Sequence, residues 1–220
     1  MAVLTIPYGT AGHQPGGPAV TIDTDARDPL RLNDGPYSYD DGIQGPGASA
    51  AERLAFLRDH LTELCDMWAK RPRQFVDLYF RFITRIMERD RARIEDKVGR
   101  LGGLFTPGDF AFSALRPLPR AHLQDIRVDF AFWTGSALVA IDITSDDSRS
   151  ATWEKRRTAL IAADVQTIEI PGSMIARDDP AILESLLPRD FAGFWQDETL
   201  PSSPFKALGL GDGLTGTPDF

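Results

Sequence analysis

The chain has 220 residues, of which 42% are hydrophobic and 25% charged, and its formal net charge is -8. This length can bury a core without cross-links, and a single cysteine, Cys65, excludes a disulfide framework within the chain. No window is apolar for long enough to cross a membrane, and no basic run followed by an apolar one opens the chain. We therefore expect a soluble cytoplasmic protein with no membrane partner.

The two ends of the chain differ in composition from its middle. Residues 1–48 are rich in Gly, Pro, Asp and Thr, and they show the period of neither a strand nor a helix. We expect an extended N-terminal arm without a core of its own. Residues 191–220 predict a similar C-terminal arm. Arms of this kind are either disordered or ordered by lying on another surface.

Residues 49–100 predict a helical hairpin. Ser49 and Glu52 have the spacing of a capping box, so the first helix should begin there. Pro72 suits the first turn of a second helix, which continues to the glycines at its end. The buried stripe of the first helix should contain Leu54, Leu57, Leu61, Leu64, Cys65 and Trp68. That of the second should contain Phe75, Val76, Tyr79, Phe82, Ile83, Ile86 and Met87.

Residues 101–190, with the helix over 92–100, predict a mixed α/β core. Phe110, Phe112 and Ala114 alternate with smaller residues, which predicts a strand. A hairpin should follow, with strands over 126–133 and 137–144 and a short turn between them.

The second half of this core should alternate helices and strands. Ser148 or Ser150 can cap a helix that runs to about Ala163. The apolar run over 165–170 predicts a strand, and an aspartate before Pro180 opens a last short helix.

Each strand of the predicted hairpin carries one carboxylate within an apolar run, Asp129 in the first and Asp142 in the second. An ionised Asp inside a sheet is costly unless something compensates it. Two carboxylates on adjacent strands can share a cation, and their oxygens suit Mg²⁺ or Mn²⁺. Two alternatives stay open: each Asp pairs with an arginine such as Arg127 or Arg156, or lies at a strand end in solvent.

With these residues, the segment 92–170 resembles the PD-(D/E)XK nucleases, whose signature is an Asp on one strand and an acid, any residue and Lys on the next. Asp129 matches the first position, and Asp142-Ile143-Thr144 matches the second. The helix after Trp153 and the strand over 165–170 resemble those that close the core of this superfamily. The resemblance implies a restriction-endonuclease-like mixed sheet flanked by helices, with metal-dependent cleavage of nucleic acid.

The sequence departs from the signature at Thr144, which stands where the family has Lys. In the superfamily this Lys orients or activates water. Some relatives that resemble very-short-patch repair endonucleases have Thr there, and others carry the Lys on the following helix, where Lys155 would serve. Glu95, on the helix before the sheet, matches an additional acid that many members use as a metal ligand. A solvated Glu on a charged helix face is the alternative.

Five basic residues step by four along the second predicted helix and form a slanted basic ribbon: Arg81, Arg85, Arg89, Arg93 and Lys97. They lie in a segment, 71–100, with nine bases and five acids, whereas 1–50 has six acids and two bases and 171–220 has eight acids and three bases. The ribbon could bind nucleic-acid phosphates. It could instead be a solvated face, or bind the acidic arms of neighbouring subunits.

Two functions follow from these observations. The first is a divergent PD-(D/E)XK-like nuclease that uses Mg²⁺ or Mn²⁺, and the Asp pair and basic ribbon favour it. The second is a structural or assembly protein with a nuclease-like fold, such as a phage head-completion, connector or neck component whose arms bind neighbouring subunits in the virion. Thr144, the acidic balance and the two arms favour the second, and fold alone cannot choose between them.

Overall fold

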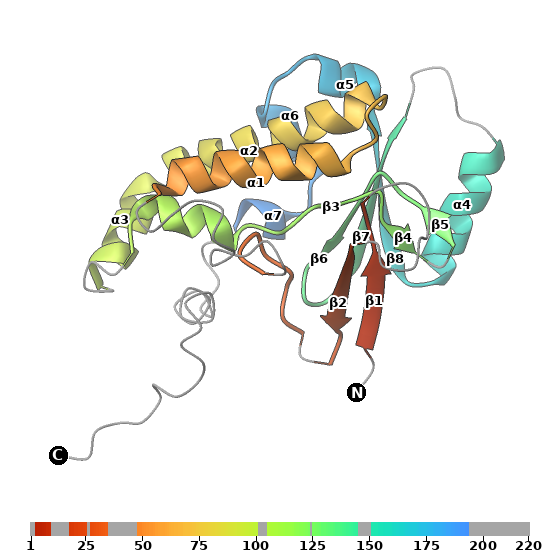
Figure 1. Ribbon diagram of the computed structural model, residues 1–220, viewed down its shortest axis with the longest axis horizontal. Helices are drawn as coiled ribbons and strands as arrows, with labels where there is room; N and C mark the ends of the chain where they lie inside the picture. The colour runs from red at the N-terminus through yellow and green to blue at the C-terminus, as the bar shows by residue number, and fades with distance from the viewer. Residues whose placement is uncertain are drawn as a thin grey trace.

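The structure is a computed structural model, and it describes residues 3–9, 18–25, 27–34, 48–100, 105–123, 125–144 and 151–193, with no side chains for 151–153. It has the mixed α/β architecture predicted from the sequence. Two long helices lie side by side along one face of a mixed sheet, and another helix lies at the far side of that sheet (Figure 1). None of the described helices is both long and apolar enough to cross a membrane.

The helical hairpin consists of α1 (Ala50–Leu64) and α2 (Lys70–Arg89). The predicted capping box is confirmed, because the Glu52 amide donates to the Ser49 hydroxyl and the Ser49 amide donates to the Glu52 carboxylate. Trp68 was expected in the buried stripe, and this prediction is wrong: its side chain is 85% exposed. The first helix ends four residues before Trp68, so helical spacing no longer directs that side chain inward.

Cys65, which caps the C-terminus of α1, is buried as predicted. Its thiol donates a hydrogen bond to the carbonyl of Leu61 at 3.5 Å. Burial raises the pKa of the Cys65 thiol to about 12. A thiol that stays protonated at neutral pH is a poor nucleophile, so Cys65 belongs to the core.

The second helix does not continue to the end of the predicted hairpin at residue 100. It ends at Arg89, and a separate helix, α3 (Arg91–Arg100), begins two residues later. Asp90 separates the two because its backbone leaves the helical region, at φ -99° and ψ 15°. Arg93 and Lys97 of the basic ribbon therefore belong to another helix than the first three members.

The central sheet has four strands in the order β3-β6-β7-β8: β3 (Leu118–Pro119), β6 (Phe130–Trp133), β7 (Leu138–Thr144) and β8 (Val165–Pro171). The predicted hairpin is confirmed, since β6 and β7 pair antiparallel, with Phe130 opposite Ile141. The last strand lies parallel to β7. Ile126–Arg127 forms a separate strand, β5, which pairs with β4 (His122–Leu123).

Aromatic side chains join α2 to the sheet. The rings of Phe75 and Phe130 are 4.6 Å apart, and those of Tyr79 and Phe132 are 5.4 Å apart. These four side chains are fully buried. Burying an aromatic side chain of this size contributes about 1.5–3 kcal/mol. The even-numbered residues of β6 thus face the helices, and the odd-numbered ones face the other side of the sheet.

The strand predicted around Phe110 and Phe112 is wrong. The chain there forms a short 3-10 helix, η1 (Pro107–Ser113), with Thr106 and Asp109 in a capping box. Pro107 occupies its first turn, where its fixed φ and missing N–H favour a helix start. Phe110 and Phe112 are both buried, and this burial requires no strand.

The described residues form four further helices: α4 (Ala151–Ala162), α5 (Gly172–Ala176), α6 (Ala181–Leu186) and α7 (Arg189–Ala192). The predicted helix after the hairpin and the one after Pro180 are confirmed by α4 and α6. The expected caps of α4, Ser148 and Ser150, lie outside the described residues. The other two helices have five and four residues and were not predicted.

The N-terminal region is not the featureless arm that its composition predicted. Val3–Pro7 (β1) and Ala19–Asp23 (β2) pair antiparallel, and Ile6, Val20 and Ile22 are buried. Further along, the Trp133 indole donates to the carbonyl of Asp28 at 2.7 Å. These contacts tie the described part of the arm to the core. Residues 10–17, 35–47 and 194–220 of the predicted arms lie outside the described ranges.

Candidate metal centre

Asp129 and Asp142, here called the carboxylate pair, meet at one edge of the sheet. The pair is held by backbone contacts: the Ile143 amide donates to Asp129 Oδ2 at 2.7 Å, and the Asp129 amide lies 3.4 Å from Asp142 Oδ1. Asp129 immediately precedes β6, so its carboxylate takes the place of a ladder partner for the Ile143 amide. The hairpin register thus brings together two acids that lie thirteen residues apart.

The surroundings of the carboxylate pair disfavour two negative charges. Burial raises the pKa of Asp129 to about 6; the negative charge of Asp142 adds to this rise, and the Ile143 hydrogen bond opposes it. Burial also raises the pKa of Asp142, against the effect of the Arg156 guanidinium. A carboxylate whose pKa is raised in this way marks a place where added positive charge is favoured.

Arg156, from α4, supplies part of that positive charge. Its Nη2 lies 3.4 Å from Asp142 Oδ1 and also donates to the carbonyl of Arg127. Pairing of Asp142 with an arginine was one of the alternatives left open by the sequence. The Arg127 guanidinium lies 3.9 Å from Asp66 Oδ2 and does not bond to the pair, although its charge lowers the pKa of Asp129. Within the described part of the chain, one guanidinium therefore bonds to the carboxylate pair, and the site keeps a negative charge when both acids are ionised.

Glu169 is a third acid at this edge, and the sequence analysis missed it. It lies opposite Asp142 in the parallel register of β7 and β8, so the two side chains share one face of the sheet. Its charge raises the pKa of Asp142. The signal was a glutamate inside the apolar strand 165–170, but it acquires meaning only once the strand register is known.

The donor set fits a hard divalent cation with few protein ligands. Among the described residues, no group of three or more His, Cys, Asp or Glu side chains is arranged to hold a metal ion. Mg²⁺ commonly uses one or two carboxylates and completes its six ligands with water and substrate phosphate. Asp129 and Asp142 offer this kind of site, and their surplus charge favours a cation. Their oxygen donors suit Mn²⁺ equally.

Thr144 and Lys155 were the two candidates to replace the missing lysine. Thr144 ends β7 two residues after Asp142, so its side chain lies on the same face of the sheet. Lys155 is exposed on α4 and makes no ion pair within the described ranges. Its neighbour Arg156 is the residue of α4 that reaches the carboxylate pair.

Glu95 does not belong to this site, so its prediction as a metal ligand is wrong. It lies on α3 and pairs with Arg91 one helical turn away, at 2.7 Å. Figure 1 shows α3 at the end of the molecule opposite to α4. The break at Asp90 contributes to this placement, because it separates α3 from the helix that packs on the sheet. The solvated helix face considered as the alternative is what the structure shows.

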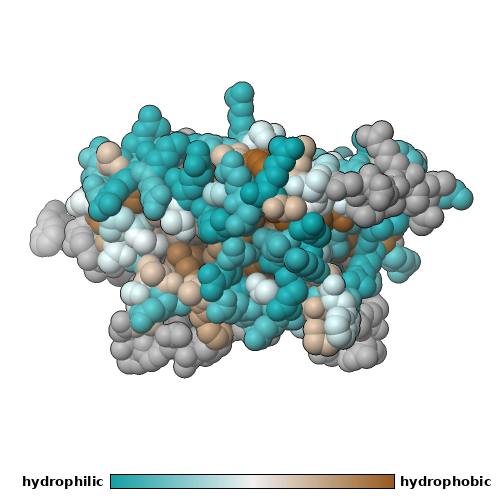
Figure 2. All heavy atoms as spheres, turned by 90° about the horizontal axis from the view of Figure 1, so that it is seen from above, coloured by the Kyte–Doolittle hydropathy of each residue, from teal (hydrophilic) through white to brown (hydrophobic). Residues whose placement is uncertain are grey.

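The basic ribbon is largely neutralised by acids of the same chain. Arg81 bonds to Asp77 and Asp178, and Arg85 and Arg89 lie against Glu184. These contacts join α2 to α6 and to the loop before it. The surface over the helices is mostly hydrophilic, with hydrophobic residues in smaller separate areas (Figure 2). The first three arginines thus act mainly within the fold, although their charge pattern suggested a phosphate-binding surface.

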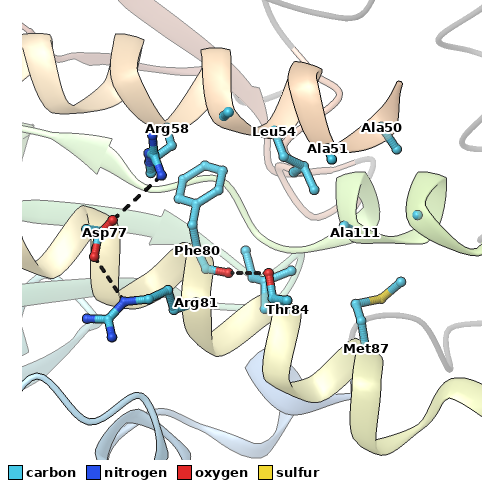
Figure 3. Close-up of a pocket in the computed structure, with 13 residues that line it drawn as sticks. Ala50, Ala51, Leu54, Arg58, Asp77, Phe80, Arg81, Thr84, Met87 and Ala111 are labelled. Atoms are coloured by element: carbon cyan, nitrogen blue, oxygen red, sulfur yellow. Dashed lines mark hydrogen bonds and ion pairs between the residues drawn. The ribbon is translucent and has the colours of Figure 1, made fainter. Parts of the chain in front are cut away.

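A groove of about 320 Å³ lies between α1, α2 and η1, away from the carboxylate pair. Its walls are mainly apolar, and Arg58, Asp77 and Arg81 form a chain of ion pairs at one end (Figure 3). Among the residues that line the groove, Asp77 carries the carboxylate, and both carboxylate oxygens of Asp77 face arginines. The groove thus offers no free acid, base or nucleophile for a reaction.

Comparison with known proteins provides no relative from which function can be transferred. No protein-family model, no curated protein and no solved structure matches the chain.

Proposed function

We propose that this chain is a divergent metal-dependent nuclease with a restriction-endonuclease-like core, which cleaves phosphodiester bonds in nucleic acid using Mg²⁺ or Mn²⁺. The observation that carries this proposal is the carboxylate pair. Asp129, just before β6, and Asp142, in β7, share a half-buried site whose surroundings disfavour their negative charge. A fold tolerates such a costly arrangement when function requires it.

The order of elements supports the same proposal. The hairpin of β6 and β7 is followed by α4 and then by β8, which returns parallel to β7. The PD-(D/E)XK resemblance implies this sequence of hairpin, helix and closing strand. Asp129 precedes the first of these strands and Asp142 lies in the second, so both acids stand at the positions that the resemblance assigns to metal ligands.

Asp129 and Asp142 would hold the cation, which when bound supplies a water of lowered pKa and offsets charge on the phosphate. The Ile143 amide fixes one oxygen of Asp129 and so orients that carboxylate. A guanidinium carries hydrogen-bond donors and no acceptor, so Arg156 can stabilise negative charge on a phosphate but cannot act as a base. Thr144 can orient a water by hydrogen bonding. Its hydroxyl keeps its proton at neutral pH, so it cannot act as a general base.

Cleavage assays with defined metals test the proposal. Purified protein is incubated with single- and double-stranded DNA and RNA in Mg²⁺, Mn²⁺ or EDTA. We expect cleavage with at least one metal, none in EDTA, and a loss of about a thousandfold in Asp142→Asn, because one of two metal ligands is removed. Asp59→Asn, an exposed acid on α1, serves as the matched control and should cleave normally. Intact substrates under all metal conditions would contradict the proposal.

The alternative proposal is a non-catalytic assembly protein built on the same fold. The observation in its favour is that both acids have protein partners, Arg156 for Asp142 and the Ile143 amide for Asp129. In this case the pair would stabilise the sheet edge, and the arms would bind neighbouring subunits. A large ring in native mass measurements, combined with no metal-dependent cleavage, would favour this alternative.

A further inference from the structure

The loop that joins α1 and α2 exposes two large apolar side chains. Trp68 is 85% exposed and Met67 is 70% exposed, the highest values among the large hydrophobic residues that the structure describes. An indole in water forgoes the large gain that its burial would provide. The exposed face is therefore available to a ligand.

The backbone of this loop is held in a defined turn. The Trp68 amide donates to the Asp66 side chain at 3.1 Å, and the Ala69 amide donates to the Asp66 carbonyl at 2.9 Å. On the N-terminal side, the buried Cys65 fixes the loop to α1. Trp68 is thus presented from an ordered backbone, which lowers the entropy lost when a ligand binds.

Contacts connect this loop to the carboxylate pair. Asp66 lies 3.9 Å from the Arg127 guanidinium, and the Arg127 carbonyl accepts a hydrogen bond from Arg156. Arg156 in turn bonds to Asp142. The loop also lies near the end of the sheet at which β7 finishes (Figure 1). The loop that carries Trp68 is therefore connected to the candidate metal centre through Asp66, Arg127 and Arg156.

The charges around the loop indicate the kind of ligand. Lys70 and Arg71 follow Trp68 after Ala69, and the guanidinium of Arg127 lies 3.9 Å from the carboxylate of Asp66 in the loop. The Arg71 side chain reaches Gly172, which itself lies against the carbonyl of Thr144 at the end of β7. A basic surface with an exposed aromatic ring is typical of proteins that bind single strands, because phosphates meet the cations and bases stack on the ring.

We propose that Trp68 stacks on an unpaired base of the strand that enters the candidate metal centre, while Lys70 and Arg71 bind its phosphates. This inference rests on the proposed function for the chemistry of the neighbouring site. It specifies the substrate class: nucleic acid with unpaired nucleotides beside the bond to be cleaved. A wholly paired duplex would offer Trp68 no free base face.

Binding measured in EDTA tests this inference separately from cleavage. Fluorescence anisotropy compares a labelled single-stranded DNA of twelve nucleotides, an abasic strand of equal length and a duplex, for four proteins: wild type, Trp68→Ala, Trp68→Phe and Ile161→Ala. Ile161 is an exposed apolar residue of α4 and serves as the control. We expect wild type to prefer the strand with bases over the abasic strand by about tenfold. Trp68→Ala should lose this preference, whereas Trp68→Phe and the control should keep it.

Each other result has a definite meaning. Retention of the preference by Trp68→Ala, equal binding of the two strands by wild type, or no binding of any strand would overturn the inference. A change in self-association of Trp68→Ala without a change in strand binding would also overturn it, in favour of a second copy as the partner. Trp68-dependent binding without cleavage in any metal would support the inference and contradict the proposed nuclease. Cleavage by a Trp68→Ala protein that binds strands as wild type does would support the proposed nuclease and overturn the inference.

Discussion

The carboxylate pair and the basic ribbon are both concentrations of charge on regular elements, but they differ in how their charge is compensated. In the ribbon, Arg81, Arg85 and Arg89 lie against acids of the same chain. In the pair, two half-buried carboxylates have one bonded guanidinium among the described residues, that of Arg156, and it bonds to Asp142. An exposed ion pair contributes less than about 1 kcal/mol, whereas an uncompensated buried carboxylate is costly. Incomplete compensation of buried charge, not the amount of charge, therefore identifies the candidate site.

The first prediction separates two neighbours on α4 and concerns the largest of the three effects considered next. Arg156→Gln should lower the cleavage rate by about a hundredfold, because it removes a fixed positive charge beside the reacting phosphate. Lys155→Gln, the matched control, should cleave at the wild-type rate, since Lys155 is exposed and makes no ion pair among the described residues. Single-turnover cleavage in Mn²⁺ measures both. The opposite ranking would restore Lys155 as the functional cation and remove Arg156 from the site.

The second prediction concerns pH and stability in EDTA. The folded pKa of Asp129 is about 6, above its ordinary value of 3.8, so the folded state holds this proton more tightly than the unfolded state. The resulting cost to the fold is absent below pH 3.8, grows as pH rises and is complete above pH 6. Asp129→Asn removes it and should raise the free energy of unfolding at pH 7 by about 1–3 kcal/mol.

Urea unfolding of wild type, Asp129→Asn and the control Asp59→Asn at pH 4 and pH 7 measures this difference. The advantage of Asp129→Asn should be near zero at pH 4 and full at pH 7. A variant that is less stable than wild type at pH 7 would show that ionised Asp129 stabilises the fold, as the assembly alternative requires.

The third prediction tests the other side of the comparison and concerns the smallest effect. Glu184→Gln removes the acid that faces Arg85 and Arg89, and should lower the free energy of unfolding by about 0.5–1 kcal/mol because the pairs are partly exposed. Glu88→Gln, on the exposed face of α2, should change the free energy of unfolding less.

Replacing Arg81, Arg85 and Arg89 together with Gln should leave strand binding within about threefold of wild type. A larger loss would make the ribbon a nucleic-acid surface after all.

Local rules predicted the parts of this fold that local chemistry decides. The Ser49 and Glu52 capping box, the hairpin of Asp129 and Asp142, and the strand at 165–170 each carry their signal within a few residues. The apolar alternation around Phe110 misled because both a strand and a 3-10 helix can bury such residues. Thr106 and Pro107 were the stronger signal there.

Long-range contacts account for what the sequence did not show. Pairing of Arg81 with Asp178 spans 97 residues, and the proximity of Glu169 to Asp142 depends on a parallel register. Arg156 was foreseen as one of two arginine partners, and the packing of α4 selected it over Arg127. The N-terminal hairpin was missed because short strands in a Gly- and Pro-rich segment are stabilised mainly by the core they pack against.

The central claim is that the carboxylate pair binds a divalent cation, and Mn²⁺ binding followed by electron paramagnetic resonance tests it most directly. Wild type and the control Asp59→Asn should each bind one Mn²⁺ more tightly than the scattered surface acids do. The double variant Asp129→Asn/Asp142→Asn should lose that ion while remaining folded. The same binding curve for all three proteins would contradict the claim and leave the pair as a structural feature of the sheet edge.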